Sequence, residues 1–340
     1  MNGAKLVGWL WGASGLARLV RLPLLPLAGA YWVGMRVRTV RADAGGIAQL
    51  PLPAIAVGNL SVGGTGKTPL AAWIARYCAA RGWRPGILLR GYGGDEPLVH
   101  RRLVPEAVVV ANPDRVAGAM AARAAGARIL VLDDAYQLLG VARDVNIAVV
   151  SAESTHGSPW PLPAGPWRER WGALARATVI VVTRKDSPAP VAAALAERLA
   201  RRRPTAPVAI AALILERLEG MRSGAPRELA VLRGHDVVAA AGIAHPESFA
   251  AQLRAAGAQV QLLAYQDHHA YHTDDVRRLV RAAATGGYVV VTEKDAVKLR
   301  ELWPADAREP LVAVLGVQWE ANGRAVEQAV DGLLGPPRRR

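Results

Sequence analysis

The sequence predicts an α/β protein with a main domain built on a parallel sheet, a second, smaller α/β domain, and a helical segment at the N-terminus. From about residue 51, short apolar runs alternate with alanine-rich helical stretches, a pattern typical of parallel sheets with helical crossovers. The chain has 340 residues, which suggests two domains at roughly 100–200 residues each. The first forty residues differ in character, because arginines bound the apolar stretches there.

The N-terminal segment, residues 1–42, holds two apolar stretches, Leu6–Ala17 and Leu22–Met35. Neither reaches the ~20 residues of a membrane-spanning helix, and Pro23 and Pro26 break the second. Its tryptophans and tyrosine favour the level of lipid headgroups, and its arginines suit an anionic surface. We therefore expect a membrane-associated helical segment that lies in the interface. A helix packed on its own domain and an export signal are the alternatives.

The first α/β domain is predicted over residues 43–207. Helical patterns between its strands include Pro69–Ala80 and Arg115–Ala125. Its predicted strands are Ala54–Val57, Gly86–Leu89, Ala107–Val110, Ile129–Leu132, Ile147–Val150 and Val179–Val182.

A predicted strand, Val208–Leu215, leads into a turn, so residues 208–226 are interpreted as interdomain linker strands. The smaller C-terminal α/β domain is predicted over residues 227–335, and the tail after it is expected to fray. The predicted strands of that domain are Val237–Ala241, Gln259–Leu263, Tyr288–Val291 and Leu311–Val314.

Composition narrows the class of partner. The chain carries 42 Lys and Arg against 28 Asp and Glu, a formal charge of +14, which favours an anionic partner such as nucleic acid, phosphoryl ligands or an acidic leaflet. Nucleic acid is not expected, because the arginines are dispersed and no recognition motif appears. The single cysteine, Cys78, excludes an intramolecular disulfide and fits a reducing compartment.

The strongest motif runs through residues 57–68, between a predicted strand and a predicted helix. A phosphate-binding loop needs glycines whose N–H groups surround the phosphates, a lysine that reaches the β/γ oxygens, and a hydroxyl for Mg²⁺. Lys67 and Thr68 meet the last two needs, although Ser61 stands where the general pattern has glycine. The motif therefore predicts a P-loop NTPase-like domain. Its predicted phosphate-binding set is Ser61, Val62, Gly63, Gly64, Thr65, Gly66, Lys67 and Thr68.

A P-loop works with an acidic residue at the end of a neighbouring buried strand. The apolar run 129–132 ends in Asp133 and Asp134, so one of these carboxylates is expected to hold Mg²⁺ directly or through water. Two further strand ends, 181–186 and 290–295, resemble the base-reading turn of GTPases with the lysine one place late. For the first of them a plain charged turn is an equal alternative.

Residues 267–275 form a dense group of titratable side chains around Asp267, His268 and His269. Three interpretations compete: a metal site, a surface loop that caps a helix with Thr273 at the N-cap, or a histidine brought over the nucleotide from the second domain.

Taken in order, these pieces resemble the tetraacyldisaccharide 4′-kinase family across nearly the whole chain. The resemblance rests on residues 58–69, 90–97, 133–137, 143–144, 163–169, 241–243, 267–271 and 292–299. It implies transfer of the ATP γ-phosphoryl group to the 4′-hydroxyl of a tetraacylated glucosamine disaccharide 1-phosphate, giving lipid IVA. It also implies a lipid substrate at the inner-membrane surface and a peripheral location on its cytoplasmic face.

The resemblance also implies roles for residues at matching positions. Lys67 and Thr68 would bind the phosphates and Mg²⁺, with Asp133 and Asp134 as carboxylates on the metal side and Gln137 nearby.

The remaining implied roles concern the transfer itself. Asp95 would take the proton of the attacking hydroxyl, with His268 from the second domain as its partner. Arg168, with Arg115, would offset charge on the phosphoryl group, and Glu169 would lie in the same shell.

One departure stands out. The family continues the second motif as Asp-Asp-Gly-Phe-Gln-His, whereas residues 133–138 here end in Leu138, so a histidine is lost.

The main rival is a membrane-associated P-loop ATPase switch of the partitioning or division-site type. Such proteins need a lysine where Val62 stands, and they leave Asp95 and residues 267–271 without a role. A nucleotide-sensing membrane scaffold is a third, non-enzymatic interpretation.

Overall fold

A computed structural model describes residues 3–12, 14–44, 46–91, 94–153, 158–283 and 286–334. Tyr92, Gly93 and the C-terminal tail that was expected to fray lie outside the described residues. The chain forms two compact units. Unit 1 comprises residues 1–92, 100–212 and 317–340, and unit 2 comprises residues 93–99 and 213–316.

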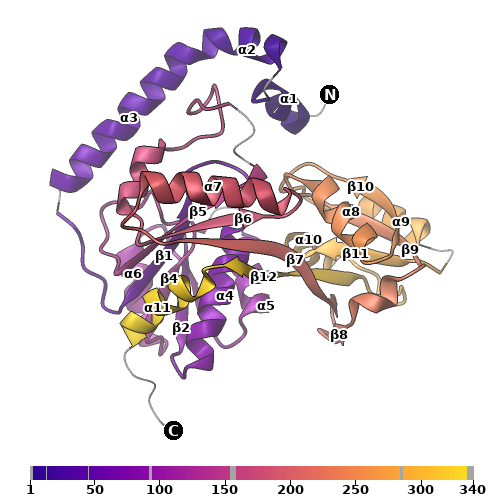
Figure 1. Cartoon of the computed structure of the whole chain (residues 1–340). Coiled ribbons are helices and arrows are strands. Elements are labelled where there is room, and N and C mark those ends of the chain that lie inside the picture. The colour runs from indigo at the N-terminus through magenta and orange to yellow at the C-terminus, as the bar shows by residue number, and fades with distance from the viewer. Residues whose placement is uncertain are drawn as a thin grey trace. The chain divides into compact units, whose positions relative to one another are not determined.

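The elements alternate between strand and helix after the N-terminal segment (Figure 1). The strands are β1 (Ala54–Asn59), β2 (Pro85–Leu89), β3 (Val108–Ala111), β4 (Ile129–Leu132), β5 (Val145–Ser151), β6 (Val179–Arg184), β7 (Val208–Gly220), β8 (Pro226–Arg227), β9 (Asp236–Ala241), β10 (Gln259–Ala264), β11 (Tyr288–Thr292) and β12 (Leu311–Ala321). The helices are α1 (Gly3–Leu10), α2 (Gly15–Arg21), α3 (Leu25–Ala44), α4 (Lys67–Ala80), α5 (Glu96–Leu103), α6 (Arg115–Ala124), α7 (Ala189–Arg202), α8 (Pro246–Ala255), α9 (Thr273–Ala282), α10 (Glu293–Leu299) and α11 (Gly323–Leu334), with 3₁₀ turns at Leu22–Leu24, Trp171–Arg176 and Leu229–Leu232.

The sheet of unit 1 is parallel and runs β3-β2-β4-β1-β5-β6-β7. Its central strands are apolar on both faces because helices cover both, as parallel sheets require. The register pairs Gly58 with Ala148, so alternate residues of β1 and β5 share one face, on which α6 and α7 pack. Helix α4 packs against β1, β2 and β4, and α11 packs against α4. The confirmed fold is therefore a parallel α/β sheet with the P-loop between β1 and α4.

Unit 2 is a smaller α/β sandwich with the strand order β10-β9-β11-β12-β7, in which β9 pairs in parallel with β10 and β11, and β11 with β12. Phe249 and Leu253 of α8 pack on one face, and Val276 and Leu279 of α9 pack on the other together with α10. Strand β8 pairs antiparallel with β7.

The units differ from the sequence-based domain limits in two places. Residues 317–334, predicted as part of the C-terminal domain, count with unit 1, where Asp331 of α11 binds Tyr77 and Arg81 of α4. Residues 93–99 count with unit 2 although the chain around them lies in unit 1. In both places the chain passes from one unit to the other, and the local composition of the sequence does not predict that change.

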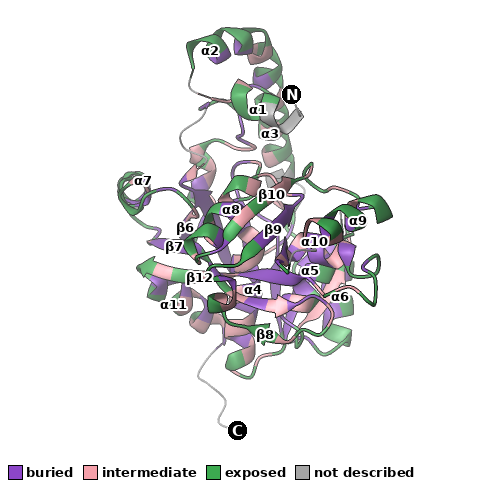
Figure 2. Ribbon diagram, turned by 90° about the vertical axis from the view of Figure 1, so that its right-hand side faces the viewer, coloured by how far each residue is buried: buried purple, intermediate pink, exposed green. Residues whose placement is uncertain are grey.

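The N-terminal segment is helical, as predicted, and α2 and α3 are largely exposed (Figure 2). The sequence-based expectation that its apolar stretches are too short to span a membrane is not met. Pro23 lies in a 3₁₀ turn and Pro26 in the first turn of α3, where prolines are tolerated, so Gly15–Arg41 is long and apolar enough to cross a membrane by length and composition. Its exposed apolar side chains are those of Leu16, Leu19, Val20, Leu22, Leu27, Trp32, Val33, Val37 and Val40.

Candidate active site

The loop after β1 has the backbone of a phosphate cradle. Gly63 and Gly66 have φ values of 107° and 86°, in the left-handed region that glycine adopts without strain. Gly66 is the N-cap of α4, so the helix begins at Lys67, and the first N–H groups of a helix have no partner within it. The Asn59 amide donates to Thr65 Oγ1 at 2.8 Å and holds the loop from inside.

The end of β6 braces this loop from its other side. Thr183 Oγ1 donates to the Thr65 carbonyl at 2.8 Å, and Lys185 Nζ donates to the Gly64 carbonyl at 2.9 Å. Glu153 secures the turn: its carboxylate accepts the backbone N–H groups of Lys185, Asp186 and Ser187. These contacts hold the phosphate loop in shape, which favours the structural interpretation of the Thr183–Asp186 turn over base reading.

Asp133, at the end of β4, is the carboxylate nearest the P-loop hydroxyl. Its Oδ2 accepts from Thr68 Oγ1 at 3.2 Å and lies 2.9 Å from Nε2 of His100, while the Asp134 N–H donates to its Oδ1 at 2.8 Å. Burial alone would raise the pKa of this carboxyl, but the hydrogen bond from His100 and the charge of Lys67 outweigh burial and lower it. Asp133 is therefore a fixed carboxylate.

Asp134 has a different environment. Its φ of 50° turns its side chain to Lys67, whose Nζ is 3.4 Å away, and to Arg168, whose Nη1 lies 3.1 and 3.2 Å from its two oxygens. The turn is possible because Gly58 has no side chain: a Cβ there would lie 2.6 Å from the Tyr136 nitrogen. The sequence could not distinguish the two aspartates, whereas the structure pairs Asp133 with a hydroxyl and Asp134 with two cations.

Other predicted residues of unit 1 surround these groups with mainly structural contacts. Gln137 Nε2 donates to the Asn59 carbonyl at 2.7 Å, and Glu169 pairs with Arg176 at 2.7 Å. Arg115 is buried and donates to the Leu89 carbonyl at 2.6 Å, and burial lowers the pKa of its guanidinium. Backbone hydrogen bonds tie the P-loop to the segment that carries Arg168: Val62 N–H donates to the Pro166 carbonyl, and the Arg168 and Glu169 N–H groups donate to the Leu60 carbonyl.

In unit 2, Asp95 lies directly before α5, and its carboxylate is almost fully buried, with 3% of the side chain exposed. His268 Nδ1 lies 3.4 Å from Oδ2, and Lys298 Nζ lies 3.3 Å from the same oxygen. Among the described residues neither oxygen accepts a hydrogen bond of good geometry. A buried carboxylate beside an imidazole and an ammonium group, with both oxygens able to accept a proton or a hydrogen bond, is suited to general-base work.

The turn that presents His268 is built around Gly242. The Gly242 carbonyl accepts from the His268 N–H, and its N–H donates to both oxygens of Asp295 at 3.1 Å. A Cβ on Gly242 would lie 3.0 Å from Asp295 Oδ1 and 3.2 Å from the His269 Cβ, so the close approach requires glycine. Burial raises the pKa of Asp295. His268 itself has a φ of 59°, which projects its ring toward Asp95.

The titratable residues at positions 267–275 fall into two groups: His268 faces Asp95, whereas His269 and His272 contact Asp275. His269 Nε2 and the His272 N–H both contact Asp275 Oδ2 at 3.0 Å, and His272, not Thr273 as predicted, is the N-cap of α9. No cluster of three metal-ligating side chains occurs among the described residues, so the metal interpretation receives no support there.

Two residues of the site escaped sequence reasoning. His100, in α5, supplies an imidazole to Asp133 across 33 residues of sequence, although the family's histidine is replaced by Leu138. Lys298, one turn beyond the Thr292–Asp295 motif on α10, approaches Asp95 from 203 positions away. The signal for Lys298 was its rarity, since only five lysines occur in the chain.

The chain is similar to known proteins over nearly its whole length. The sequence profile described as tetraacyldisaccharide-1-P 4'-kinase matches residues 20–94 and 93–335. The tetraacyldisaccharide 4'-kinase of Anaeromyxobacter sp. (strain K) is 34% identical over 98% of this chain and 96% of its own length. That of Azoarcus sp. (strain BH72) is 35% identical over 90% of this chain and 91% of its own.

A solved structure has the same fold. The crystal structure of the "apo" form of LpxK from Aquifex aeolicus, in complex with ATP, matches with a TM-score of 0.71 at 24% identity, covering 92% of this chain and 99% of that chain.

Proposed function

The chain belongs to the tetraacyldisaccharide-1-P 4'-kinase family, and from that premise we propose that it transfers the γ-phosphoryl group of ATP to the 4′-hydroxyl of a tetraacyldisaccharide 1-phosphate, giving lipid IVA. In this reaction the hydroxyl oxygen forms a bond to the γ-phosphorus, the bond from that phosphorus to the β,γ-bridging oxygen breaks, and ADP leaves. The hydroxyl proton passes to a protein base.

The observation that carries the proposal within unit 1 is the meeting of Thr68 and Asp133 at the mouth of a glycine cradle. A hydroxyl and a carboxylate 3.2 Å apart are the hard oxygen donors that Mg²⁺ prefers, and the residues present therefore fit this ion. We propose that Thr68 and Asp133 hold it, since the oxygens of Asp134 already face Lys67 and Arg168. Bound there, Mg²⁺ would neutralise charge on the β- and γ-phosphates.

Asp95 is the proposed base. Its burial removes competing water, and both of its oxygens are free of hydrogen-bond donors among the described residues, with His268 Nδ1 3.4 Å and Lys298 Nζ 3.3 Å from Oδ2. His268 orients the carboxylate, and half of its own side chain is exposed, so the proton can pass on to solvent. Nothing in the ATPase-switch alternative requires such a buried carboxylate.

Arg168 and Lys67 are the proposed cations on the transferring group. Both hold Asp134 at 3.1–3.4 Å in the structure, so they are pre-positioned over the P-loop and can exchange this partner for phosphate oxygens. The backbone N–H groups of Gly64, Gly66 and the first residues of α4 would supply the remaining donors to the phosphates.

The proposed location is the cytoplasmic face of the inner membrane, where an acylated acceptor and ATP are both accessible. The exposed apolar side chains of α2 and α3 support contact with a membrane.

A lipid-kinase assay tests the proposal. Purified protein with Mg-ATP and tetraacyldisaccharide 1-phosphate should give a bis-phosphorylated lipid, and ATP turnover should depend on the lipid. Turnover that ignores the lipid would favour the ATPase switch. Asp95→Ala should lower kcat about 10²–10⁴-fold, the usual range for a general base. Near-normal turnover of that variant would remove Asp95 from the mechanism, and unchanged activity of Lys67→Ala would remove the P-loop.

A further inference from the structure

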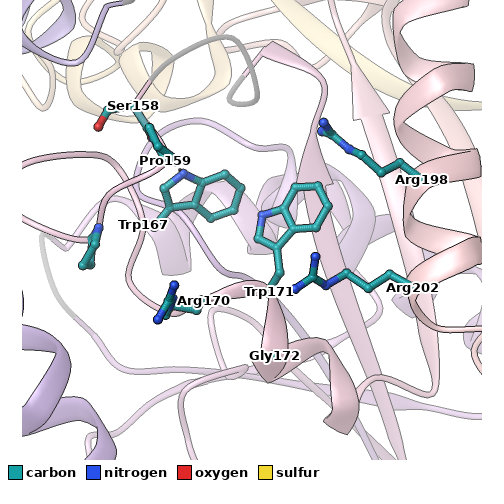
Figure 3. A pocket seen from close by; sticks show the side chains of 9 residues that line it. Ser158, Pro159, Trp167, Arg170, Trp171, Gly172, Arg198 and Arg202 are labelled. Carbon is teal, nitrogen blue, oxygen red and sulfur yellow. Dashed lines mark hydrogen bonds between the residues drawn. The ribbon is translucent and has the colours of Figure 1, made fainter. Parts of the chain in front are cut away.

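A hollow of about 520 Å³ lies between residues 158–172 and helix α7 (Figure 3). Two indoles, Trp167 and Trp171, form its apolar wall, and Trp167 is fixed by a hydrogen bond from Nε1 to the Ser158 carbonyl at 3.1 Å. Its lining residues are Ser158, Pro159, Pro161, Trp167, Arg170, Trp171, Gly172, Arg198 and Arg202.

Three guanidinium groups face this hollow: those of Arg170, Arg198 and Arg202. Among the described residues none of the three has a carboxylate partner. Arg198 and Arg202 lie over the Trp171 ring at 4.7 and 5.8 Å. By contrast Arg201, next in the chain and outside the lining, pairs with Glu197 at 3.6 Å. Helix α7 therefore directs two unneutralised cations to the hollow and neutralises the neighbour that points elsewhere.

The hollow is also tied to the N-terminal helices. The Ser158 N–H donates to the Trp11 carbonyl at 2.7 Å, and Trp11 Nε1 donates to the Pro163 carbonyl at 3.0 Å. Arg170 lies 5.7 Å from the centre of the Trp32 ring of α3, and the Trp32 side chain is itself exposed. The hollow thus contacts α3 through Arg170 and Trp32, one of the exposed apolar side chains of that helix.

From this arrangement we propose that the hollow binds the phosphate headgroup of an anionic membrane phospholipid. Guanidinium forks bind phosphate oxygens with paired hydrogen bonds, and indoles are suited to the boundary between headgroups and acyl chains. The acyl chains would then follow the exposed apolar side chains of α2 and α3. This inference rests on the proposed membrane contact of the N-terminal segment and adds a lipid-selective site to it.

The phosphate-binding loop has its own cationic side chains, separate from those of the hollow. Lys67 and Arg168 serve it and pair with Asp134, whereas among the described residues none of the hollow's arginines forms an ion pair or a hydrogen bond with a P-loop residue. A second source of the same chemistry is the 1-phosphate of the lipid substrate, and the experiment separates the two.

The test is sedimentation of the full chain with phosphatidylcholine vesicles, with and without phosphatidylglycerol and in the absence of substrate. Arg202→Gln is compared with Arg201→Gln, which removes the same charge from the adjacent position of the same helix. At about 1 kcal/mol for one basic residue at an anionic surface, Arg202→Gln should weaken binding to phosphatidylglycerol vesicles about fivefold. Arg201→Gln should stay within twofold of the wild type, and the pure phosphatidylcholine vesicles should not distinguish the three proteins.

Equal losses of vesicle binding for the two variants would indicate nonspecific electrostatic attraction to the anionic surface, and would overturn the proposed headgroup site. Unchanged vesicle binding with a raised KM for the lipid substrate in neutral micelles would assign the hollow to the substrate's phosphate and overturn the phospholipid assignment. Failure of the wild type to bind either vesicle would overturn the membrane contact as well. Both arginines are exposed, so circular dichroism should show that each variant keeps the wild-type fold.

Discussion

Glu153 connects the stability of the fold to the shape of the phosphate loop, and Glu153→Gln tests that connection. Its Oε1 accepts the N–H of Lys185 at 2.7 Å, that of Ser187 at 3.2 Å and that of Asp186 at 3.3 Å, and its other oxygen accepts from the Ser151 hydroxyl. Burial alone would raise its pKa, but these hydrogen bonds lower it from 4.5 to about 2.

The size of the effect follows from that shift. At about 1.4 kcal/mol for each pKa unit, the fall from 4.5 to about 2 corresponds to roughly 3 kcal/mol of preference for the charged form. Part of the side chain is solvated and glutamine keeps one carbonyl oxygen, so we expect Glu153→Gln to cost about 1–2 kcal/mol of unfolding free energy near pH 7.

The pH dependence has a definite sign. Because the folded-state pKa is depressed, the stabilisation is complete above 4.5 and is lost as the pH falls from there toward about 2. Urea unfolding should therefore separate the variant from the wild type near neutral pH and bring the two together as the pH approaches 2. Loosening of the Lys185 contact to Gly64 should also raise the KM for ATP.

Glu197→Gln is the matched control, because Glu197 is 70% exposed and pairs only with Arg201 at 3.6 Å among the described residues. It should change stability by less than about 0.5 kcal/mol. The reasoning is refuted if Glu153→Gln unfolds like this control near neutral pH, or if its loss of stability is the same at all pH values.

Three further predictions concern the two side-chain clusters of the candidate site, around Asp133 and Asp95, and the N-terminal segment. Lys298→Gln should lower kcat about tenfold with little change in the KM for ATP, because it removes the ammonium group that lies 3.3 Å from the buried Asp95 carboxylate. Lys294→Gln on the same helix is the control, and equal kcat values for the two variants would contradict this role. His100→Leu should lower the free energy of unfolding by about 2 kcal/mol, because it removes a buried hydrogen bond to a charged group, and it should weaken Mg-ATP binding. His100→Gln should retain part of the stability and part of the affinity. Calorimetry and ATP titration would contradict this role of His100 if the two variants behaved alike. Deletion of residues 1–42 should move the protein from the vesicle pellet to the supernatant, and continued sedimentation would exclude these helices as the anchor.

Local patterns in the chain were enough for the fold class and for the phosphate-binding loop. Strand and helix periodicity, and the glycine spacing before Lys67 and Thr68, depend on neighbours within a few residues, which a single sequence displays in full. The carboxyl ends of adjacent parallel strands meet at one edge, so the pairing of Asp133 with the P-loop also followed from order along the chain.

Contacts between distant segments were decided by the tertiary structure alone. His100 reaches Asp133, and Lys298 joins His268 at Asp95, because helices from separate parts of the chain pack beside the strand ends, and no local periodicity encodes that approach. Asp133 and Asp134 likewise have different partners because Asp134 adopts a left-handed backbone conformation. This conformation turns its side chain to Lys67, while the side chain of Asp133 contacts Thr68. Packing, rather than residue type, assigned each of these charges its partner.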